Sequence, residues 1–169
     1  MKKIFCYLLL SCVFFILVAC GKKESQKAFE SQFKEFNSII TERMQNADEG
    51  TKKMAEIINK VTYKVNKVEE NGDNSQLNVT IKAVNLGKYV NEYIEAATAK
   101  FGTEKQPDEK EFTDFTVEYF TNVANDKNLE YVETDVNVEM QKIEGEWKVV
   151  NGDELVLAIL GGAGNSVDI

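Results

Sequence analysis

The sequence contains no histidine, and this absence excludes a large class of catalytic and metal sites. Ser-His-Asp triads, Cys-His dyads and histidine-ligated zinc or iron all require an imidazole ring. The single arginine, Arg43, leaves little capacity for bidentate binding of carboxylate or phosphate groups. Any catalysis by this chain would depend on Asp, Glu, Tyr, Lys or Ser side chains, and we expect no cofactor and no metal.

Cysteine is scarce and lies only near the N-terminus, at Cys6, Cys12 and Cys20. Cys6 and Cys12 belong to an apolar run, and Cys20 follows directly after it. Every later position holds another residue type, so the polar part of the chain can form no disulfide and no thiolate metal site.

Basic residues are also few, with 20 Lys and Arg against 28 Asp and Glu and a net charge of −8. Nucleic-acid binding requires basic side chains that neutralise phosphates. The charge balance therefore disfavours a nucleic-acid partner, and it also weakens attraction to anionic lipid surfaces.

The N-terminus has the pattern of a secretory signal. Lys2 and Lys3 precede an apolar run of 16 residues, Ile4–Ala19, which only Ser11 interrupts. A membrane span needs about 20 apolar residues, whereas a signal peptide combines a basic start, a shorter apolar middle and a small final residue. The pattern predicts export from the cytoplasm.

The end of this run, Leu17-Val18-Ala19-Cys20, resembles the lipobox of bacterial lipoproteins. The resemblance implies cleavage between Ala19 and Cys20 and a diacylglycerol thioether on Cys20, with palmitate-like acyl chains. Two or three such chains hold a protein firmly in a bilayer. We therefore expect a protein anchored to the cell membrane on its extracytoplasmic face. A signal peptide with an incidental cysteine and an uncleaved signal anchor remain alternatives.

The chain divides into four predicted segments. We assign residues 1–19 to the lipoprotein signal peptide and 20–27 to the lipidated cysteine and a short polar tether. Residues 28–162 form one α+β domain, since their number is typical of a single domain. Residues 163–169 form a flexible tail.

Hydrophobic periodicity predicts five helices and four strands in that domain. Asn66-Lys67 interrupts an alternating strand and indicates a bulge, and Asn71-Gly72 indicates a hairpin turn. Asn85 is expected to cap a helix that ends at Gly102, and Pro107 is expected in the first turn of the next helix. The predicted helices cover about 25–46, 51–60, 86–101, 107–124 and 154–160, and the strands about 61–68, 77–83, 129–143 and 147–150.

The order of these elements predicts an α+β fold. We expect an antiparallel sheet of about four strands, made of two hairpins, with amphipathic helices packed on one face in a cone-like arrangement. Glu133, Asp135 and Glu139 alternate with apolar residues on the third strand, and we expect this acidic row to face solvent.

The segment Gly145-Glu146-Trp147-Lys148-Val149 resembles the last hairpin of small nuclear-transport-factor-two-like domains found in lipoproteins of unknown function. The resemblance implies a curved sheet that a long helix closes into a cone. Enzymes of that superfamily use a carboxylate base and a tyrosine donor inside the cone. The resemblance therefore suggests a pocket lined by aromatic side chains, although none of the candidate residues can be matched to the enzyme pattern. The candidate lining residues are Tyr63, Tyr93, Tyr119, Tyr131 and Trp147.

Three functions remain open from the sequence. The first is a non-catalytic module that binds a small apolar ligand, a peptide or another envelope protein. The second is a small envelope enzyme of isomerase or hydrolase type that uses Asp, Glu and Tyr, and the third is a structural subunit of an envelope assembly. The deciding observation is whether the concave face of the sheet encloses a cavity or is filled by Phe29, Phe33, Phe36 and Trp147.

Overall fold

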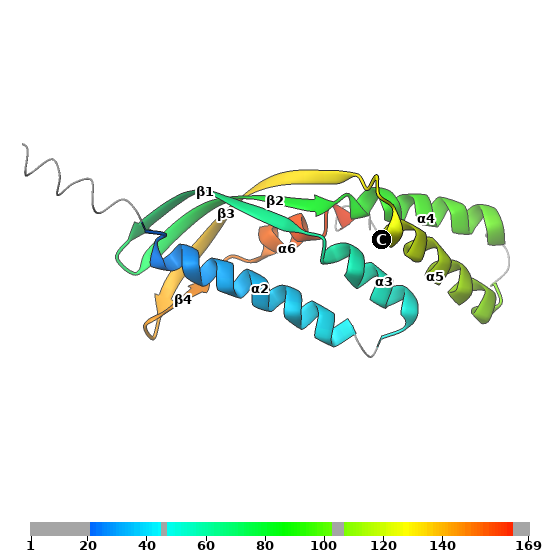
Figure 1. Ribbon diagram of the computed structural model, residues 1–169, viewed down its shortest axis with the longest axis horizontal. Helices are drawn as coiled ribbons and strands as arrows, with labels where there is room; N and C mark the ends of the chain where they lie inside the picture. Colours follow the sequence, from blue (N-terminus) through cyan, green and yellow to red (C-terminus); the bar gives the residue numbers. More distant parts are fainter. Residues whose placement is uncertain (1–20, 45–46, 103–106, 164–169) are drawn as a thin grey trace, which may run out of the picture.

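The computed structural model describes residues 21–44, 47–102 and 107–163. One antiparallel sheet has the strand order β1-β2-β3-β4, and the helices α2, α3 and α6 pack against the same face of it (Figure 1). This arrangement confirms the predicted α+β fold class. The elements follow the chain in this order: α2 (Glu24–Met44), α3 (Glu49–Ile58), β1 (Thr62–Asn71), β2 (Asn74–Val84), α4 (Leu86–Phe101), α5 (Glu109–Asn125), β3 (Tyr131–Ile143), β4 (Glu146–Val149) and α6 (Asp153–Ile159).

The sheet has one buried face and one polar face, because apolar and polar residues alternate along its strands. Leu77, Val79 and Ile81 of β2 are fully buried, and the first two lie opposite Val138 and Val136 of β3. The predicted bulge is confirmed, since the pairing of β1 with β2 shifts register between Val65 and Lys67. Among the described helices, Figure 1 shows none lying over the polar face.

The concave face of the sheet is filled by side chains. Phe29 and Phe33 of α2 are 1% and 5% exposed, and Trp147 of β4 is 7% exposed. The rings of Phe29 and Phe33 contact Tyr63 of β1, with centroids 5.5 and 4.5 Å apart. Phe36 packs at the edge of this cluster and is partly buried. The centre of the sheet face is therefore a packed core.

A second core lies where α3, α4 and α5 meet the end of β2. Ile57 and Phe120 are buried at its centre, and Val84, Leu86 and Tyr89 join them from the β2–α4 junction. The predicted N-cap is confirmed, because the Asn85 side chain accepts a hydrogen bond from the backbone N–H of Lys88 at 3.2 Å. The helix α4 covers 86–101 as predicted, with Gly102 as its C-cap.

Two predicted boundaries need correction. The helix α2 already begins at Glu24 and Ser25 is fully buried, so only residues 21–23 of the predicted tether precede the folded domain. Pro107 lies before α5 rather than in its first turn. Asp108 caps α5 instead, because its carboxylate accepts a hydrogen bond from the backbone N–H of Glu111.

Several predictions fall on parts of the chain outside the described residues. They include the signal peptide 1–19, the lipobox Leu17-Val18-Ala19 with Cys20, and the tail beyond Ala163. Within the described ranges, no helix combines the length and the apolar character that a membrane crossing requires.

Candidate functional site

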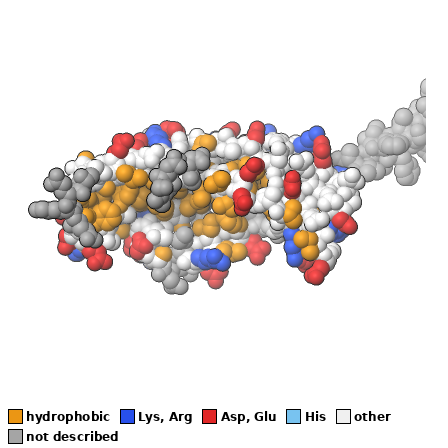
Figure 2. All heavy atoms as spheres, turned by 180° about the vertical axis from the view of Figure 1, so that it is seen from behind, with side chains coloured by type: hydrophobic (Ala, Val, Ile, Leu, Met, Phe, Trp, Pro, Cys, Tyr) orange, Lys and Arg blue, Asp and Glu red, His pale blue; other side chains and the backbone are white. Residues whose placement is uncertain are grey.

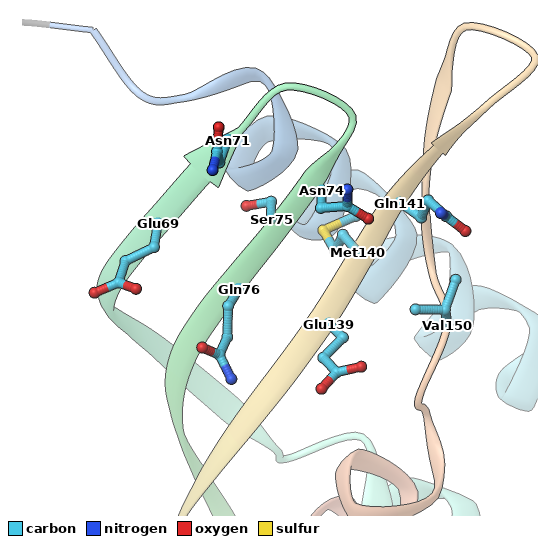
Figure 3. A pocket seen from close by; sticks show the side chains of 9 residues that line it. All are labelled: Glu69, Asn71, Asn74, Ser75, Gln76, Glu139, Met140, Gln141 and Val150. Carbon is cyan, nitrogen blue, oxygen red and sulfur yellow. The ribbon is translucent and has the colours of Figure 1, made fainter.

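The open face of the sheet carries a shallow polar groove of about 510 Å³ near the β1–β2 turn (Figure 3). Glu69, Gln76 and Glu139 form one row across β1, β2 and β3, because they are register partners on adjacent strands. The residues that line the groove are Glu69, Asn71, Asn74, Ser75, Gln76, Glu139, Met140, Gln141 and Val150. The groove can donate and accept hydrogen bonds.

The acidic side chains of β3 do not converge on one point. Glu133 forms an ion pair with Lys82 at 3.2 Å, and Asp135 accepts a hydrogen bond from the Thr80 hydroxyl at 2.5 Å. Glu139 lies further along the strand, in the polar groove. In the chain as described, no group of three acidic or thiol side chains is placed to hold a metal ion. The row faces solvent, as the alternation predicts.

An apolar pocket of about 200 Å³ lies between α2, the end of β4 and α6. Its polar side chain, Gln32, is already engaged, because it donates to the Trp147 carbonyl at 2.6 Å and accepts from the Val149 N–H at 3.4 Å. Such a pocket can hold a small apolar group, since apolar cavities of about 150 Å³ bind molecules the size of benzene. Its lining residues are Phe29, Gln32, Phe33, Phe36, Val149, Gly152, Leu155, Val156 and Ile159.

A buried polar cluster ties the start of α2 to the sheet. The Glu70 carboxylate of β1 accepts hydrogen bonds from the Ser25 hydroxyl at 2.7 Å and from the Ser25 backbone N–H at 3.1 Å. The Ser75 hydroxyl of β2 donates to the Ser25 hydroxyl at 2.8 Å. The first N–H groups of a helix lack intrahelical partners, so Glu70 caps α2 from another element. We call Ser25, Glu70 and Ser75 the α2 clamp.

The clamp makes a testable contribution to stability. The Ser25 hydroxyl, together with its N–H, holds the pKa of Glu70 below its ordinary value, even though burial opposes the shift. A lowered folded-state pKa means that the charge stabilises the fold above the unfolded-state pKa. This stabilisation is lost as pH falls through the folded-state pKa. We expect Glu70→Gln to lower the free energy of unfolding at pH 7 by about 1 kcal/mol.

Urea unfolding at pH 7 and at several pH values below 4.5, the ordinary pKa of a glutamate, measures this effect. The difference between the native chain and Glu70→Gln should shrink as the pH falls. Glu69→Gln is the matched control, because its carboxylate points to the open face and pairs there with Lys67. An equal loss in both variants would contradict a specific role of the clamp.

A fourth feature is an aromatic cluster between α4 and α5. The Tyr93 ring of α4 lies 5.8 Å from Phe115, 5.4 Å from Tyr119 and 5.2 Å from Phe120. Burial, with the nearby charge of Glu92, raises the pKa of Tyr119 to about 12. Its hydroxyl therefore stays protonated and donates to the Tyr89 carbonyl at 3.0 Å. Tyr119 therefore acts as a packing residue that also joins α5 to α4.

Carboxyl groups that interact strongly have lowered pKa values. Ser25 lowers the pKa of Glu70, Lys22 lowers that of Glu30, and Lys88 with Asn85 lowers that of Glu130. A carboxylic general acid needs the opposite shift, which burial without a donor produces. These carboxylates are held in the ionised state by structural partners.

The five aromatic residues predicted to line a pocket lie in three separate places. Tyr63 and Trp147 belong to the core under α2, and Tyr93 and Tyr119 belong to the cluster between α4 and α5. Tyr131 is 39% exposed at the start of β3, with the Lys82 ammonium 5.6 Å from its ring centre.

Sequence patterns missed the α2 clamp and the exposure of Ile94 on α4 and of Phe112 on α5. Ser25 and Glu70 are 45 positions apart, and neither stands out in a local pattern. The aromatic spacing on 86–101 and 109–125 did predict amphipathic helices. It did not indicate which rings would stay at the surface after the two helices paired.

Comparison with known proteins identifies no family for this chain. No protein-family model matches it, and no curated protein sequence matches it. One solved structure with a similar arrangement is that of ycdA, a candidate lipoprotein from Bacillus subtilis subsp. subtilis, with 16% sequence identity and a TM-score of 0.46. The match covers 79% of this chain and 46% of the ycdA chain, so this chain spans less than half the length of that protein. The resemblance to nuclear-transport-factor-two-like domains stays a prediction.

Proposed function

We propose that this protein is a lipoprotein held on the extracytoplasmic face of the cell membrane by lipid on Cys20, and that its domain is a non-catalytic binding module. The main observation behind this proposal is the short separation between the lipobox and the folded domain. Only residues 21–23 separate Cys20 from Glu24, the first residue of α2. Three extended residues span about 10 Å, so the start of α2 would lie close to the lipid headgroups.

The α2 clamp supports this proposal. A domain anchored by one chain end bears any pull on that end through its first helix. Glu70 and Ser75 hold Ser25, which is the second residue of that helix. The clamp joins the anchored end directly to β1 and β2 of the sheet.

The packing of the core supports a binding role in preference to a catalytic one. Phe29, Phe33 and Trp147 fill the concave face, where an enzyme of the cone type would hold its substrate. The remaining surfaces are an open polar groove, a small apolar pocket and the α4–α5 pair. Such surfaces can recognise ligands or partners by contact.

Metabolic labelling tests the anchor directly. Cells that express the native chain are grown with an alkyne analogue of palmitate, and the purified protein is examined for label after protease digestion. We expect label on the peptide that begins at Cys20, and we expect the protein to remain with membranes after a high-salt wash. Unlabelled protein that is found free in solution would refute the proposed anchor.

A further inference from the structure

We propose that the α4–α5 pair binds a cationic, amphipathic segment of a partner protein. The inference names the partner of the proposed binding module and therefore rests on that function. Figure 1 shows the pair projecting beyond the end of the sheet, at the opposite end of the long axis from the start of α2. Figure 2 shows hydrophobic side chains gathered toward that end of the molecule, with acidic side chains beside them.

The pair exposes large apolar side chains. Ile94 of α4 is 50% exposed and Phe112 of α5 is 39% exposed. Phe101 and Phe115 are only partly covered, although their rings contact each other at 5.5 Å. The rings of Phe112 and Phe115 also contact the Tyr93 ring, so the exposed side chains belong to one aromatic network. Rigid aromatic residues that are partly exposed are typical anchors of binding surfaces.

The net charge of the α4–α5 pair indicates which charge the partner should carry. Outside 103–106, residues 86–125 carry seven acidic side chains against three lysines. All three lysines are engaged by acids, Lys88 with Glu130, Lys100 with Glu111 and Lys110 with Asp114. In contrast, four carboxylates of the described part of the pair have no ion-pair partner there: Glu95, Asp108, Glu109 and Glu118. The surface therefore attracts a cation.

The aromatic rings already hold one cation. The Lys100 ammonium lies 5.1 Å from the centre of the Phe101 ring and 5.0 Å from that of Phe115. Its distance to the Glu111 carboxylate is 3.8 Å, and its side chain is exposed. A cation over an aromatic face is attracted by the electron-rich ring. These rings thus provide a place for an ammonium or guanidinium group beside an apolar surface.

Two other occupants fit the observations less well. A second copy of the chain would bring two acidic α4–α5 pairs together, and the like charges would repel. A membrane would have to be met at the end of the molecule farthest from the proposed lipid, by a surface with unpaired carboxylates. A partner segment that combines aliphatic residues with lysine or arginine satisfies both the apolar patch and the charge.

Titration calorimetry with a synthetic helical peptide of leucine and lysine tests the proposal. The full protein is used in phosphatidylcholine nanodiscs, or as released soluble protein if it carries no lipid, so failure of the anchor does not affect the result. We expect binding that weakens with added salt, and no binding of a matched peptide of leucine and glutamate. Ile94→Ser should weaken binding about fivefold, and combination with Phe112→Ser more than about tenfold.

Leu157→Ser is the matched control, because Leu157 is 49% exposed on α6, outside the pair. It should change the affinity by less than about twofold. The proposal is overturned if Leu157→Ser weakens binding as much as Ile94→Ser, or if both peptides bind equally. Dimerisation or vesicle binding that depends on Ile94 would assign the surface to a second copy or to a membrane, and would also overturn it.

Discussion

Replacement of Cys20 by serine is expected to abolish fatty-acid labelling of this protein completely. A serine hydroxyl cannot form the thioether that a thiol forms with diacylglycerol. The resemblance to a lipobox also implies that cleavage between Ala19 and Cys20 follows lipid attachment. Cys20→Ser should therefore keep residues 1–19, which intact-mass spectrometry of the purified chain would show directly.

The signal segment offers a matched control for this experiment. Cys12→Ser removes a thiol eight positions earlier, inside the apolar run. It should leave both the label and the processed mass unchanged, because serine is small and the lipobox is intact. Label that persists in Cys20→Ser would mean that Cys6 or Cys12 carries the lipid. In that case the proposed tether of residues 21–23 would be wrong.

Local sequence patterns predicted the elements of the fold well. The helix at 86–101 has its observed bounds because apolar side chains recur along one face and Asn85 and Gly102 mark its ends. The bulge near Asn66 was visible because alternation failed there. These features depend on residues a few positions apart, which a linear pattern records directly.

Contacts between distant parts of the chain were not predictable in the same way. Ser25 is polar and lies within the predicted tether 20–27, so no local pattern indicated that it would be buried. Its burial is tolerated because Glu70 and Ser75 satisfy its hydrogen bonds. Likewise, the pairing of β2 with β3 spans two intervening helices, and it decides that the β3 acids share the open face with Gln76.

The candidate surfaces follow from such pairings as well. Tyr93 and Tyr119 were predicted as possible pocket residues, and both lie between α4 and α5 as packing elements. Tyr93 and Tyr119 are partly buried in this contact, whereas Ile94 and Phe112 stay exposed. Which apolar residues stay exposed is a property of the packed pair, whereas each helix alone shows only an amphipathic stripe.

Gly161→Ala is expected to be strongly destabilising. An added Cβ at Gly161 would lie 1.9 Å from the Val84 carbonyl oxygen and 3.1 Å from the Leu86 nitrogen. Both are backbone atoms at the β2–α4 junction, so they cannot rotate away as a side chain could. Gly161 also has a φ of +54°, which an L side chain disfavours, and its carbonyl accepts the Gly87 N–H at 3.2 Å.

Gly162→Ala distinguishes the steric clash of the added Cβ from the conformational cost of a positive φ. Gly162 also has a positive φ, +82°, but nothing lies within 4 Å of its added Cβ. Gly162→Ala should lower the free energy of unfolding only by the conformational cost of a positive φ, about 1–2 kcal/mol. Gly161→Ala should lower it by about 3–5 kcal/mol. Urea denaturation of both variants measures the difference. Equal losses would show that the end of α6 moves freely from the β2–α4 junction, and that the second core does not depend on this contact.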